Sequence, residues 1–326
     1  MRTLGVRLER WPLAAAFVIS RGAKTEAAVV VAEIADGPQR GRGEAVPYAR
    51  YGESPESVLA QIETCRARVE AGARRDELQV LLPPGAARNA LDCALWDLEA
   101  RQAGVRAWTL AGLSRLDPVK TCYTISLGSR DEMASQARAN AGRPMLKLKI
   151  GGPDDLDALE AVRAAAPRAR LIVDANEALS LEDLNRLAPA FQALGVGLVE
   201  QPLPAGRDAE LAGYRGPVTL CADESLHSRA ELAACRGLYG VVNIKLDKAG
   251  GLTEALTLAA EARAMGYSLM IGSMVSTSLG VAPALILAQQ AAFVDLDGPL
   301  LLAVDRPPSL AIGGSVLGPP APELWG

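Results

Sequence analysis

The run Met-Leu-Lys-Leu-Lys-Ile at residues 145–150 begins the part of the sequence that decides the fold. It is followed by RLIVD at 170–174, VGLVE at 196–200, VTLCAD at 218–223 and VVNIKL at 241–246. Each run is short and aliphatic, and alanine- and leucine-rich stretches separate most of them. This pattern is typical of strands that alternate with helices, and such alternation predicts a parallel sheet.

Three further runs extend the series to eight: Val119–Leu127 before it, and Ser268–Gly272 and Ala292–Leu296 after it. Eight β/α units predict a closed (β/α)8 barrel. A doubly wound sheet is the alternative, but it usually has fewer strands, and one that binds a dinucleotide carries a glycine-rich first turn. The sequence contains neither a GxGxxG motif nor a phosphate-binding loop, so the barrel is the better prediction.

The chain outside this series has a different pattern. Thr25–Ile34 is predicted to be a strand, and Ser54–Ala71 and Ala86–Ala103 are predicted to be helices. After Asp297 there is no ninth unit. We therefore predict three parts: an N-terminal α+β region at 1–116, the barrel with the active site at 117–298, and a segment at 299–326 that returns to the N-terminal region.

Composition excludes several function classes. The 326 residues carry a net charge of −4 and no basic stripe, which argues against nucleic acid as a partner. No stretch approaches the ~20 apolar residues of a membrane helix. Five cysteines without a CxxC pair favour free thiols in the cytoplasm. The single histidine, His227, excludes multi-histidine zinc sites. A homo-oligomer remains open.

Charged residues end most of the predicted strands. From Lys149 to Asp174, Glu200, Asp223 and Lys245 the intervals are 25, 26, 23 and 22 residues, each about one β/α unit. The C-terminal strand ends of a barrel form its active-site face, so these side chains should converge there. A solvated loop would explain any one of them. Nothing structural requires such a residue at the end of five strands in succession, and the series therefore predicts an active site.

Asp174, Glu200 and Asp223 form a set of hard oxygen donors on successive strands. Such donors favour Mg²⁺, or Mn²⁺ in its place. Lys149 and Lys245 belong to strands on opposite sides of the barrel, so they should face each other across the metal. A neutral lysine could then remove the α-proton of a substrate carboxylate while the other, protonated, returns one to the opposite face. The predicted reaction is a 1,1-proton transfer, which gives the epimer.

The basic lysine needs a pKa below its usual value of ~10.4 to act near neutral pH. The metal ion, the opposing lysine and Lys147, which lies two residues from Lys149 on the same face of the strand, would supply the positive charge that lowers it. Lys147 is accordingly predicted to assist electrostatically. An ion pair between Lys147 and a loop carboxylate is the alternative.

The segments KLKIG, IVDANE, LVEQPL, ADES and NIKLDKAGG together resemble the muconate-lactonising subgroup of the enolase superfamily. The resemblance extends from Trp11 to Asp305. It implies an N-terminal α+β capping domain over a modified (β/α)8 TIM barrel. It also implies that Lys149 and Lys245 are the acid/base pair and that Mg²⁺ is bound by the three carboxylates named above.

The sequence Asp295-Leu296-Asp297 discriminates among members of this subgroup. The resemblance assigns this DxD motif to the free α-amino group of a dipeptide, and an N-acyl substrate or a muconate would leave both carboxylates unpaired. A surface turn is the alternative for this motif. RYGES at 50–54 and GAARNALDCALWDLEARQ at 85–102 also resemble bacterial L-Ala-D/L-Glu epimerases.

The expected function is therefore Mg²⁺-dependent epimerisation of the C-terminal residue of a dipeptide such as L-Ala-D/L-Glu, in the breakdown of cell-wall peptides. Four alternatives are a dipeptide epimerase of other specificity, an N-acylamino acid racemase, an o-succinylbenzoate synthase-like dehydratase and a non-catalytic ligand-binding barrel.

One residue departs from the pattern of the glutamate-specific enzymes. Lys24 stands where an arginine is expected to clamp the glutamate side chain, and lysine keeps the charge but loses the bidentate fork. Glutamate or aspartate stays the favoured side chain, with relaxed specificity open. Thr124 and Ser273 are predicted to line the site, with core or loop packing as the alternative. Phe17 and Tyr51 fit either a cavity wall or the core of the capping domain.

Overall fold

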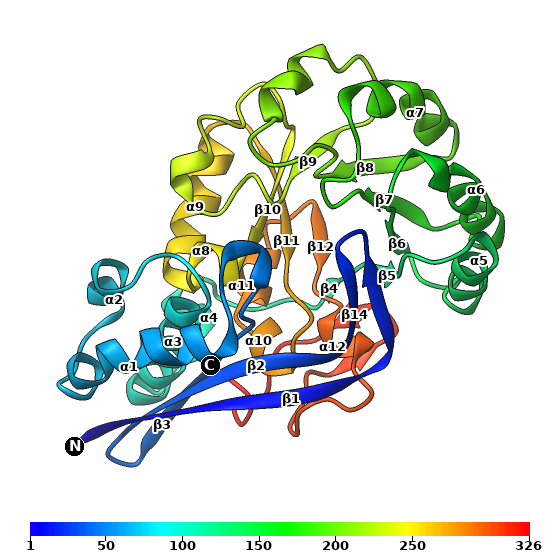
Figure 1. The fold of residues 1–326 in the computed structure, drawn as a ribbon. Helices are drawn as coiled ribbons and strands as arrows, with labels where there is room; N and C mark the ends of the chain where they lie inside the picture. Colours follow the sequence, from blue (N-terminus) through cyan, green and yellow to red (C-terminus); the bar gives the residue numbers. More distant parts are fainter.

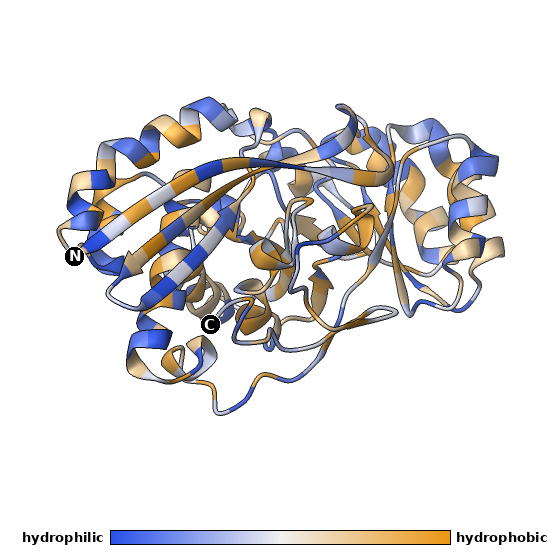
Figure 2. Cartoon of the chain, turned by 90° about the horizontal axis from the view of Figure 1, so that it is seen from below, coloured by the Kyte–Doolittle hydropathy of each residue, from blue (hydrophilic) through white to orange (hydrophobic).

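The computed structural model describes residues 1–326. The N-terminal part is a three-stranded antiparallel sheet in the order β1-β2-β3, formed by Arg2–Ile19, Gly22–Asp36 and Gln39–Ala45. In Figure 1 the long β1–β2 hairpin, in dark blue, runs from the N-terminus toward the strands of the second, larger sheet. The first half of the outer strand β1 alternates between hydrophilic and hydrophobic residues, as Figure 2 shows near the N-terminus.

Strand β2 is buried on both faces over residues 29–32. Val30, Ala32 and Ile34 belong to a core shared with the helices of the N-terminal part, whereas Val29 and Val31 belong to the large core that includes the barrel. Side chains alternate between the faces of a strand, so a continuous apolar run results when both faces are covered. This explains why the sequence VVVA has no polar alternation.

Four helices accompany this sheet: α1 (Pro55–Glu70), α2 (Arg75–Leu81), α3 (Ala86–Ala103) and α4 (Ala107–Leu110). Strand β3 lies directly on α3 through two glycines. A Cβ atom on Gly41 would lie 2.2 Å from the carbonyl oxygen of Ala94, and one on Gly43 would lie 2.1 Å from that of Ala90. The close approach of strand and helix therefore requires glycine at both positions.

Eight parallel strands form the second sheet, in the order β12-β11-β10-β9-β8-β7-β6-β5. They are β5 (Tyr123–Ile125), β6 (Met145–Lys149), β7 (Arg170–Asp174), β8 (Val196–Glu200), β9 (Leu220–Ala222), β10 (Val241–Lys245), β11 (Ser268–Gly272) and β12 (Phe293–Asp295). The prediction of a (β/α)8-type barrel with an N-terminal α+β part is confirmed.

The connecting helices are α5 (Arg130–Ala139), α6 (Leu156–Ala165), α7 (Leu181–Ala193), α8 (Leu246–Ala249), α9 (Leu252–Ala264), α10 (Ser278–Val281), α11 (Ala284–Ala288) and α12 (Gly298–Leu301). The connections from β8 to β9 and from β9 to β10 contain only short 3-10 turns, at Asp208–Gly213 and Arg229–Glu231. None of the helices combines the length and apolar character needed to cross a membrane.

The seam between the first and last barrel strands differs from the predicted single strand Val119–Leu127. The run splits into β4 (Val119–Lys120) and β5, and β4 pairs with β14 (Val316–Leu317), which pairs with β13 (Ile312–Gly313). Between them the Cys122 amide donates to the Val294 carbonyl at 2.9 Å. The split occurs because the C-terminal segment takes the first residues of the run as its own partner.

The C-terminal segment also reaches the N-terminal part. Trp325 is fully buried and donates its indole N–H to the Cys93 carbonyl in α3 at 3.0 Å. Domain boundaries at 116/117 and 298/299 stay predictions.

A buried ion cluster joins the N-terminal sheet to the barrel. Arg306 donates to Glu44 of β3 at 2.9 Å, to Glu9 of β1 and, at 3.1 Å, to the hydroxyl of Thr277 in the β11–α10 loop. The Glu44 side chain has no exposed area. Burial raises the pKa of Glu44, and Arg306 opposes that rise. Arg306 therefore compensates a charge that water cannot reach.

We expect Arg306→Met to lower the free energy of unfolding by about 3–5 kcal/mol, because it leaves the buried Glu44 carboxylate without its cation. The matched control is Arg229→Met. Arg229 also pairs with two glutamates, Glu254 and Glu261, but its side chain is 44% exposed. That change should cost less than about 1 kcal/mol. Urea unfolding measures both, and equal losses would contradict the assignment.

Candidate active site

The charged residues predicted from the strand ends lie together at the C-terminal edge of the barrel. Lys149, Asp174, Glu200 and Lys245 are the last residues of their strands, and Asp223 follows β9 directly. In the parallel register Asp174 pairs with Lys149 on one side and with Glu200 on the other. All five are buried, so they are not solvated loop residues.

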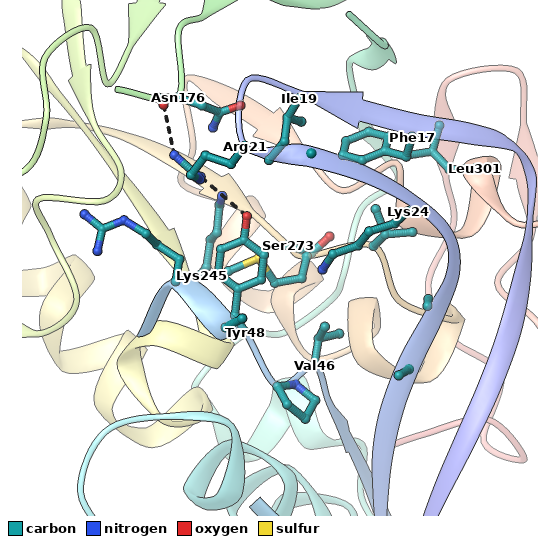
Figure 3. A pocket seen from close by; sticks show the side chains of 18 of the residues that line it. Phe17, Ile19, Arg21, Lys24, Val46, Tyr48, Asn176, Lys245, Ser273 and Leu301 are labelled. Atoms are coloured by element: carbon teal, nitrogen blue, oxygen red, sulfur yellow. Dashed lines mark hydrogen bonds between the residues drawn. The ribbon is translucent and has the colours of Figure 1, made fainter. Parts of the chain in front are cut away.

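A cavity of about 750 Å³ lies above these residues. The barrel contributes lysines, Asp223 and polar residues near the strand ends, and the N-terminal part contributes the tip of the β1–β2 hairpin and residues 46–55. Figure 3 shows Lys24 of β2 in the same space as Tyr48, Lys245 and Ser273. This volume suits a small-molecule ligand.

Lys147 and Lys149 occupy the space beside the first two carboxylates. The Lys147 ammonium lies 2.6 Å from Asp295, 2.8 Å from Glu200 and 3.0 Å from Asp174. The Lys149 ammonium lies 2.5 Å from Asp174 Oδ2, the oxygen that Lys147 also contacts. Sequence analysis gave two interpretations of Lys147: electrostatic assistance to the catalytic lysine, or an ion pair with a loop carboxylate. Lys147 shares Asp174 with Lys149, and it also forms ion pairs, but with carboxylates of the site and not with a loop carboxylate.

Two lysines hold the third carboxylate. Lys245 donates to Asp223 Oδ2 at 2.7 Å, and Lys248 donates to Asp223 Oδ1 at 2.6 Å. Lys248 also donates to the Asp223 and Asn243 carbonyls, and the Gln201 side chain accepts from the Asp223 amide at 2.9 Å. Sequence analysis did not single out Lys248. Its position three residues after Lys245, one helical turn on, is the signal that could have identified it.

The three carboxylates fit a divalent cation by donor chemistry. Glu200 Oε2 is buried and receives no hydrogen bond of acceptable geometry, although the Lys147 ammonium lies 2.8 Å away. Burial, and then the charge of Asp174, raise the pKa of Glu200 to about 8. The carboxylates do not meet as a ready-made metal cluster, since Asp174 contacts Lys149 and Asp223 contacts Lys245. Glu200 Oε2, a buried oxygen without a hydrogen bond that lies between Asp174 and Asp223, is the kind of atom that a cation would bind.

The pKa of Lys245 differs from the sequence expectation. Burial lowers the pKa of Lys245, but the negative charges of Asp223 and Glu200 together outweigh burial and the pKa is raised. The same balance, with Asp174, Asp295 and Glu200 as the carboxylates, raises the pKa of Lys147. The expected lowering needs positive charge on these carboxylates, because each uncompensated carboxylate stabilises the ammonium form.

Asp295, the last residue of β12, and Asp297, two residues beyond it, line the cavity and are buried, so they are not a surface turn. Asp295 accepts from the Cys122 thiol at 3.0 Å, and Asp297 accepts from the Thr124 amide at 2.6 Å. Burial and the charge of Asp295 raise the pKa of Asp297 to about 6. Thr124 and Ser273 both line the cavity, and Thr124 uses its backbone on Asp297.

Lys24 has a distinct electrostatic environment. Its ammonium lies 4.8 Å from the centre of the Tyr48 ring and forms no ion pair. Every other cationic side chain that lines the cavity is paired with a carboxylate: Arg21, Arg50, Lys147, Lys149 and Lys245. Lys24 is thus the one cation in the cavity that is free for a ligand.

Phe17 and Tyr51 line the cavity, which favours the wall over the core of the N-terminal part. His227 is not among the lining residues. Its ring packs against Tyr51, with 4.3 Å between the ring centroids. Sequence analysis also missed Arg21, Arg50 and Glu177, which join the hairpin and residues 49–51 to the barrel.

Comparison with known proteins agrees with this arrangement. Residues 1–112 match the mandelate racemase/muconate lactonizing enzyme N-terminal domain, and residues 131–298 match the enolase C-terminal domain-like family. The chain is 50% identical over 312 residues to the L-Ala-D/L-Glu epimerase of Escherichia coli K12, covering 95% of this chain and 97% of the relative. It is 43% identical over 301 residues to the N-acetyl-D-glutamate racemase of a Pseudoalteromonas species, covering 91% and 95%.

Solved structures extend this likeness to three dimensions. An enolase family member of Agrobacterium tumefaciens with homology to dipeptide epimerases, solved with sodium and L-Ala-L-Glu, has a TM-score of 0.99 and 53% identity over all of both chains. The dipeptide epimerase of Methylococcus capsulatus, complexed with Mg and L-Arg-D-Lys, has a TM-score of 0.87 and 31% identity over 97% and 96% of the chains. The chain therefore belongs to the mandelate racemase/muconate lactonizing enzyme family of the enolase superfamily.

Proposed function

We propose that the protein is a dipeptide epimerase that inverts the α-carbon of the C-terminal residue of a dipeptide, with L-Ala-D/L-Glu as the preferred substrate. The observation that carries this proposal is the pair Lys149 and Lys245, which open into one cavity from β6 and β10. Three strands separate β6 from β10 in either direction around the eight-strand barrel, so the two amines approach a ligand from opposite sides.

In the proposed reaction the substrate α-carbon lies between these amines. One lysine, neutral, takes the α-hydrogen as a proton from one face, and the other, charged, gives a proton to the opposite face. The C–H bond broken and the C–H bond formed are on the same carbon, so the product is the epimer and no proton is gained or lost overall. The reverse reaction exchanges the roles of the two lysines.

We assign the metal site to Asp174, Glu200 and Asp223. When bound there, Mg²⁺, or Mn²⁺ in its place, supplies positive charge that stabilises the negative charge developing on the substrate carboxylate. The related dipeptide epimerase complexed with Mg supports a divalent metal. Lys147, which already contacts three carboxylates, adds a fixed positive charge beside the same group.

Asp295 and Asp297 support a substrate with a free ammonium group. An N-acylated substrate, as in the related N-acetyl-D-glutamate racemase, would leave Asp297 with only the Thr124 amide as partner. Burying such a carboxylate against an apolar acyl group is costly. The same argument weighs against an o-succinylbenzoate synthase-like dehydratase, and the opposed lysines weigh against a non-catalytic barrel.

Lys24 supports an acidic side chain on the epimerised residue, because it is the unpaired cation of the cavity. Both curated relatives named above have glutamate in the name of their substrate. We further propose a cytoplasmic location and a role in the breakdown of cell-wall peptides. All five cysteines are free and buried, which fits a reducing compartment.

The direct test is a dipeptide library incubated with enzyme and Mg²⁺ in D₂O. Epimerisation exchanges the α-hydrogen of the C-terminal residue, so mass spectrometry should show a gain of one deuterium, greatest for L-Ala-L-Glu. EDTA should abolish exchange, and added Mg²⁺ should restore it. Faster exchange with N-acetyl-glutamate than with any dipeptide would refute the proposed substrate class, and full exchange in EDTA would refute the metal.

Replacing either lysine should separate the two half-reactions. Lys149→Ala and Lys245→Ala should each lower epimerisation by at least about 10³-fold, the order of a general acid–base contribution. Each variant should still exchange the α-hydrogen of one epimer through the lysine that remains, and the two variants should prefer opposite epimers. The control is Lys120→Ala, an exposed lysine of β4. Normal turnover in either active-site variant would contradict the two-base mechanism.

The side-chain assignment is tested at Lys24. Lys24→Met should lower kcat/KM for L-Ala-L-Glu about 10–100-fold, the value of a charge-assisted hydrogen bond, while leaving L-Ala-L-Met within a few-fold. Lys24→Arg should preserve or raise the preference for glutamate through its bidentate fork. Equal losses for both substrates in Lys24→Met would show that Lys24 does not bind the side chain.

A further inference from the structure

Glu177 lies outside the cavity, three residues beyond the end of β7, on a backbone turn that is unusual for its residue types. Asn176 has φ 42° and Glu177 has φ 72°, and the chain contains only one other non-glycine residue with positive φ, Gln201. Left-handed conformations cost free energy for residues with a side chain, and they persist where surrounding contacts fix them. The contacts that fix this turn therefore point to its structural role.

Two arginines from the N-terminal part bind this turn. Arg50 donates from Nε to Glu177 Oε2 at 2.9 Å and from Nη2 to Oε1 at 2.8 Å, which is a bidentate pair. Arg21 donates from Nη1 to the Asn176 carbonyl at 2.9 Å and to Glu177 Oε2 at 3.0 Å (Figure 3 shows its bond to Asn176). The Ala205 amide donates to Glu177 Oε1 at 2.8 Å. Each carboxylate oxygen of Glu177 thus accepts two hydrogen bonds.

The two arginines belong to segments that are distant in sequence and both line the cavity. Arg21 is at the tip of the β1–β2 hairpin, three residues from Lys24. Arg50 is in the 3-10 turn Ala49–Tyr51, between the cavity residues Tyr48 and Tyr51. Arg21 also donates to Tyr48 at 3.4 Å and to Glu224 at 2.6 Å. Glu177 is the only carboxylate that pairs with Arg50 and the only one that pairs with both arginines.

The Glu177 side chain is suited to hold these segments. It is 10% exposed, whereas Arg21 and Arg50 are 26% and 38% exposed, so the anion is fixed and the cations come to it. Burial would raise the pKa of Glu177, but the hydrogen bonds from Arg50 and Ala205 and the charges of both arginines outweigh it and lower the pKa. The carboxylate is therefore ionised at neutral pH.

We propose that Glu177 is a positioning residue that fixes the hairpin tip and the 49–51 turn over the cavity, and so sets where Lys24, Tyr48 and Tyr51 stand around the substrate side chain. This inference rests on the proposed function for the identity of the substrate only. Glu177 does not line the cavity, so it acts on the substrate through the two segments.

The test is Glu177→Gln, which keeps the size of the side chain. Each carboxylate oxygen of Glu177 accepts two hydrogen bonds. In either orientation of the glutamine amide, its NH₂ group would therefore face two donors and lose both bonds. KM for L-Ala-L-Glu should rise about 10-fold or more with a smaller change in kcat, and amide hydrogen exchange should accelerate in residues 18–25 and 46–54 but not in the barrel strands. The matched control is Glu254→Gln, because Glu254 is 12% exposed and pairs with Arg229, and neither residue lines the cavity.

Arg50→Gln should raise KM in the same way, and the double variant should be little worse than Glu177→Gln alone, because both changes break one pair. Wild-type KM and unchanged exchange in both segments would overturn the inference. Faster exchange throughout the barrel, or independent effects of the two changes, would also overturn it, because either shows a general structural role. Failure of the proposed function is separate: the wild-type enzyme would then not exchange the substrate α-hydrogen, while hydrogen exchange of the protein would still decide the role of Glu177.

Discussion

The compensation of buried charge at the barrel mouth constrains the rest of the structure. Five buried carboxylates, Asp174, Glu200, Asp223, Asp295 and Asp297, lie there with four buried lysines, Lys147, Lys149, Lys245 and Lys248. Ions removed from water are tolerated only when they are paired, and the ion pairs here account for most of them. One negative charge is in excess, and burial together with a neighbouring carboxylate raises the pKa of Glu200 and that of Asp297.

In the proposed assignment, the excess negative charge at the barrel mouth helps to accommodate the metal ion. A divalent cation brings two positive charges, and the ammonium and carboxylate at the two ends of a dipeptide cancel. The mouth then carries one positive charge if every lysine is protonated, and it becomes neutral when one lysine loses its proton. The same set of carboxylates that raises the pKa of Lys245 in the absence of a cation would thus favour one neutral lysine once a cation and substrate are present. A neutral lysine is what a general base requires.

These groups could be predicted from the sequence because residues that recur once per β/α unit all lie at the same edge of a barrel. Strand ends about one β/α unit apart must meet at the same rim, so Lys149, Asp174, Glu200 and Lys245 could be placed without knowledge of any partner. Val119–Leu127 was less predictable. It splits because distant residues 316–317 pair with Val119 and Lys120.

Residues whose partners are distant in sequence carried no such signal. Glu177 and Arg21 are 156 positions apart, and Glu177 and Arg50 are 127 apart. Positive φ at Asn176 and Glu177 is equally hidden, because glycine is the residue that marks such turns. The raised pKa of Lys245 could not be predicted either, since it depends on a carboxylate that lies 2.7 Å away in space and 22 residues away in sequence.

In the proposed assignment, the ammonium group and the side chain of the ligand meet different parts of the chain. The aspartates that would bind an ammonium group belong to the barrel, at the end of β12 and just beyond it, whereas Lys24 belongs to the hairpin of the N-terminal part. Two related proteins both have glutamate in the name of their substrate, but its amino group carries an alanyl residue in one and an acetyl group in the other. This difference is consistent with separate contacts for the amino end and the side chain. In the proposed assignment, a change at residues 295–297 would alter the preference for the amino end without moving Lys24, and a change in the hairpin would alter the side-chain preference without disturbing Lys149 and Lys245.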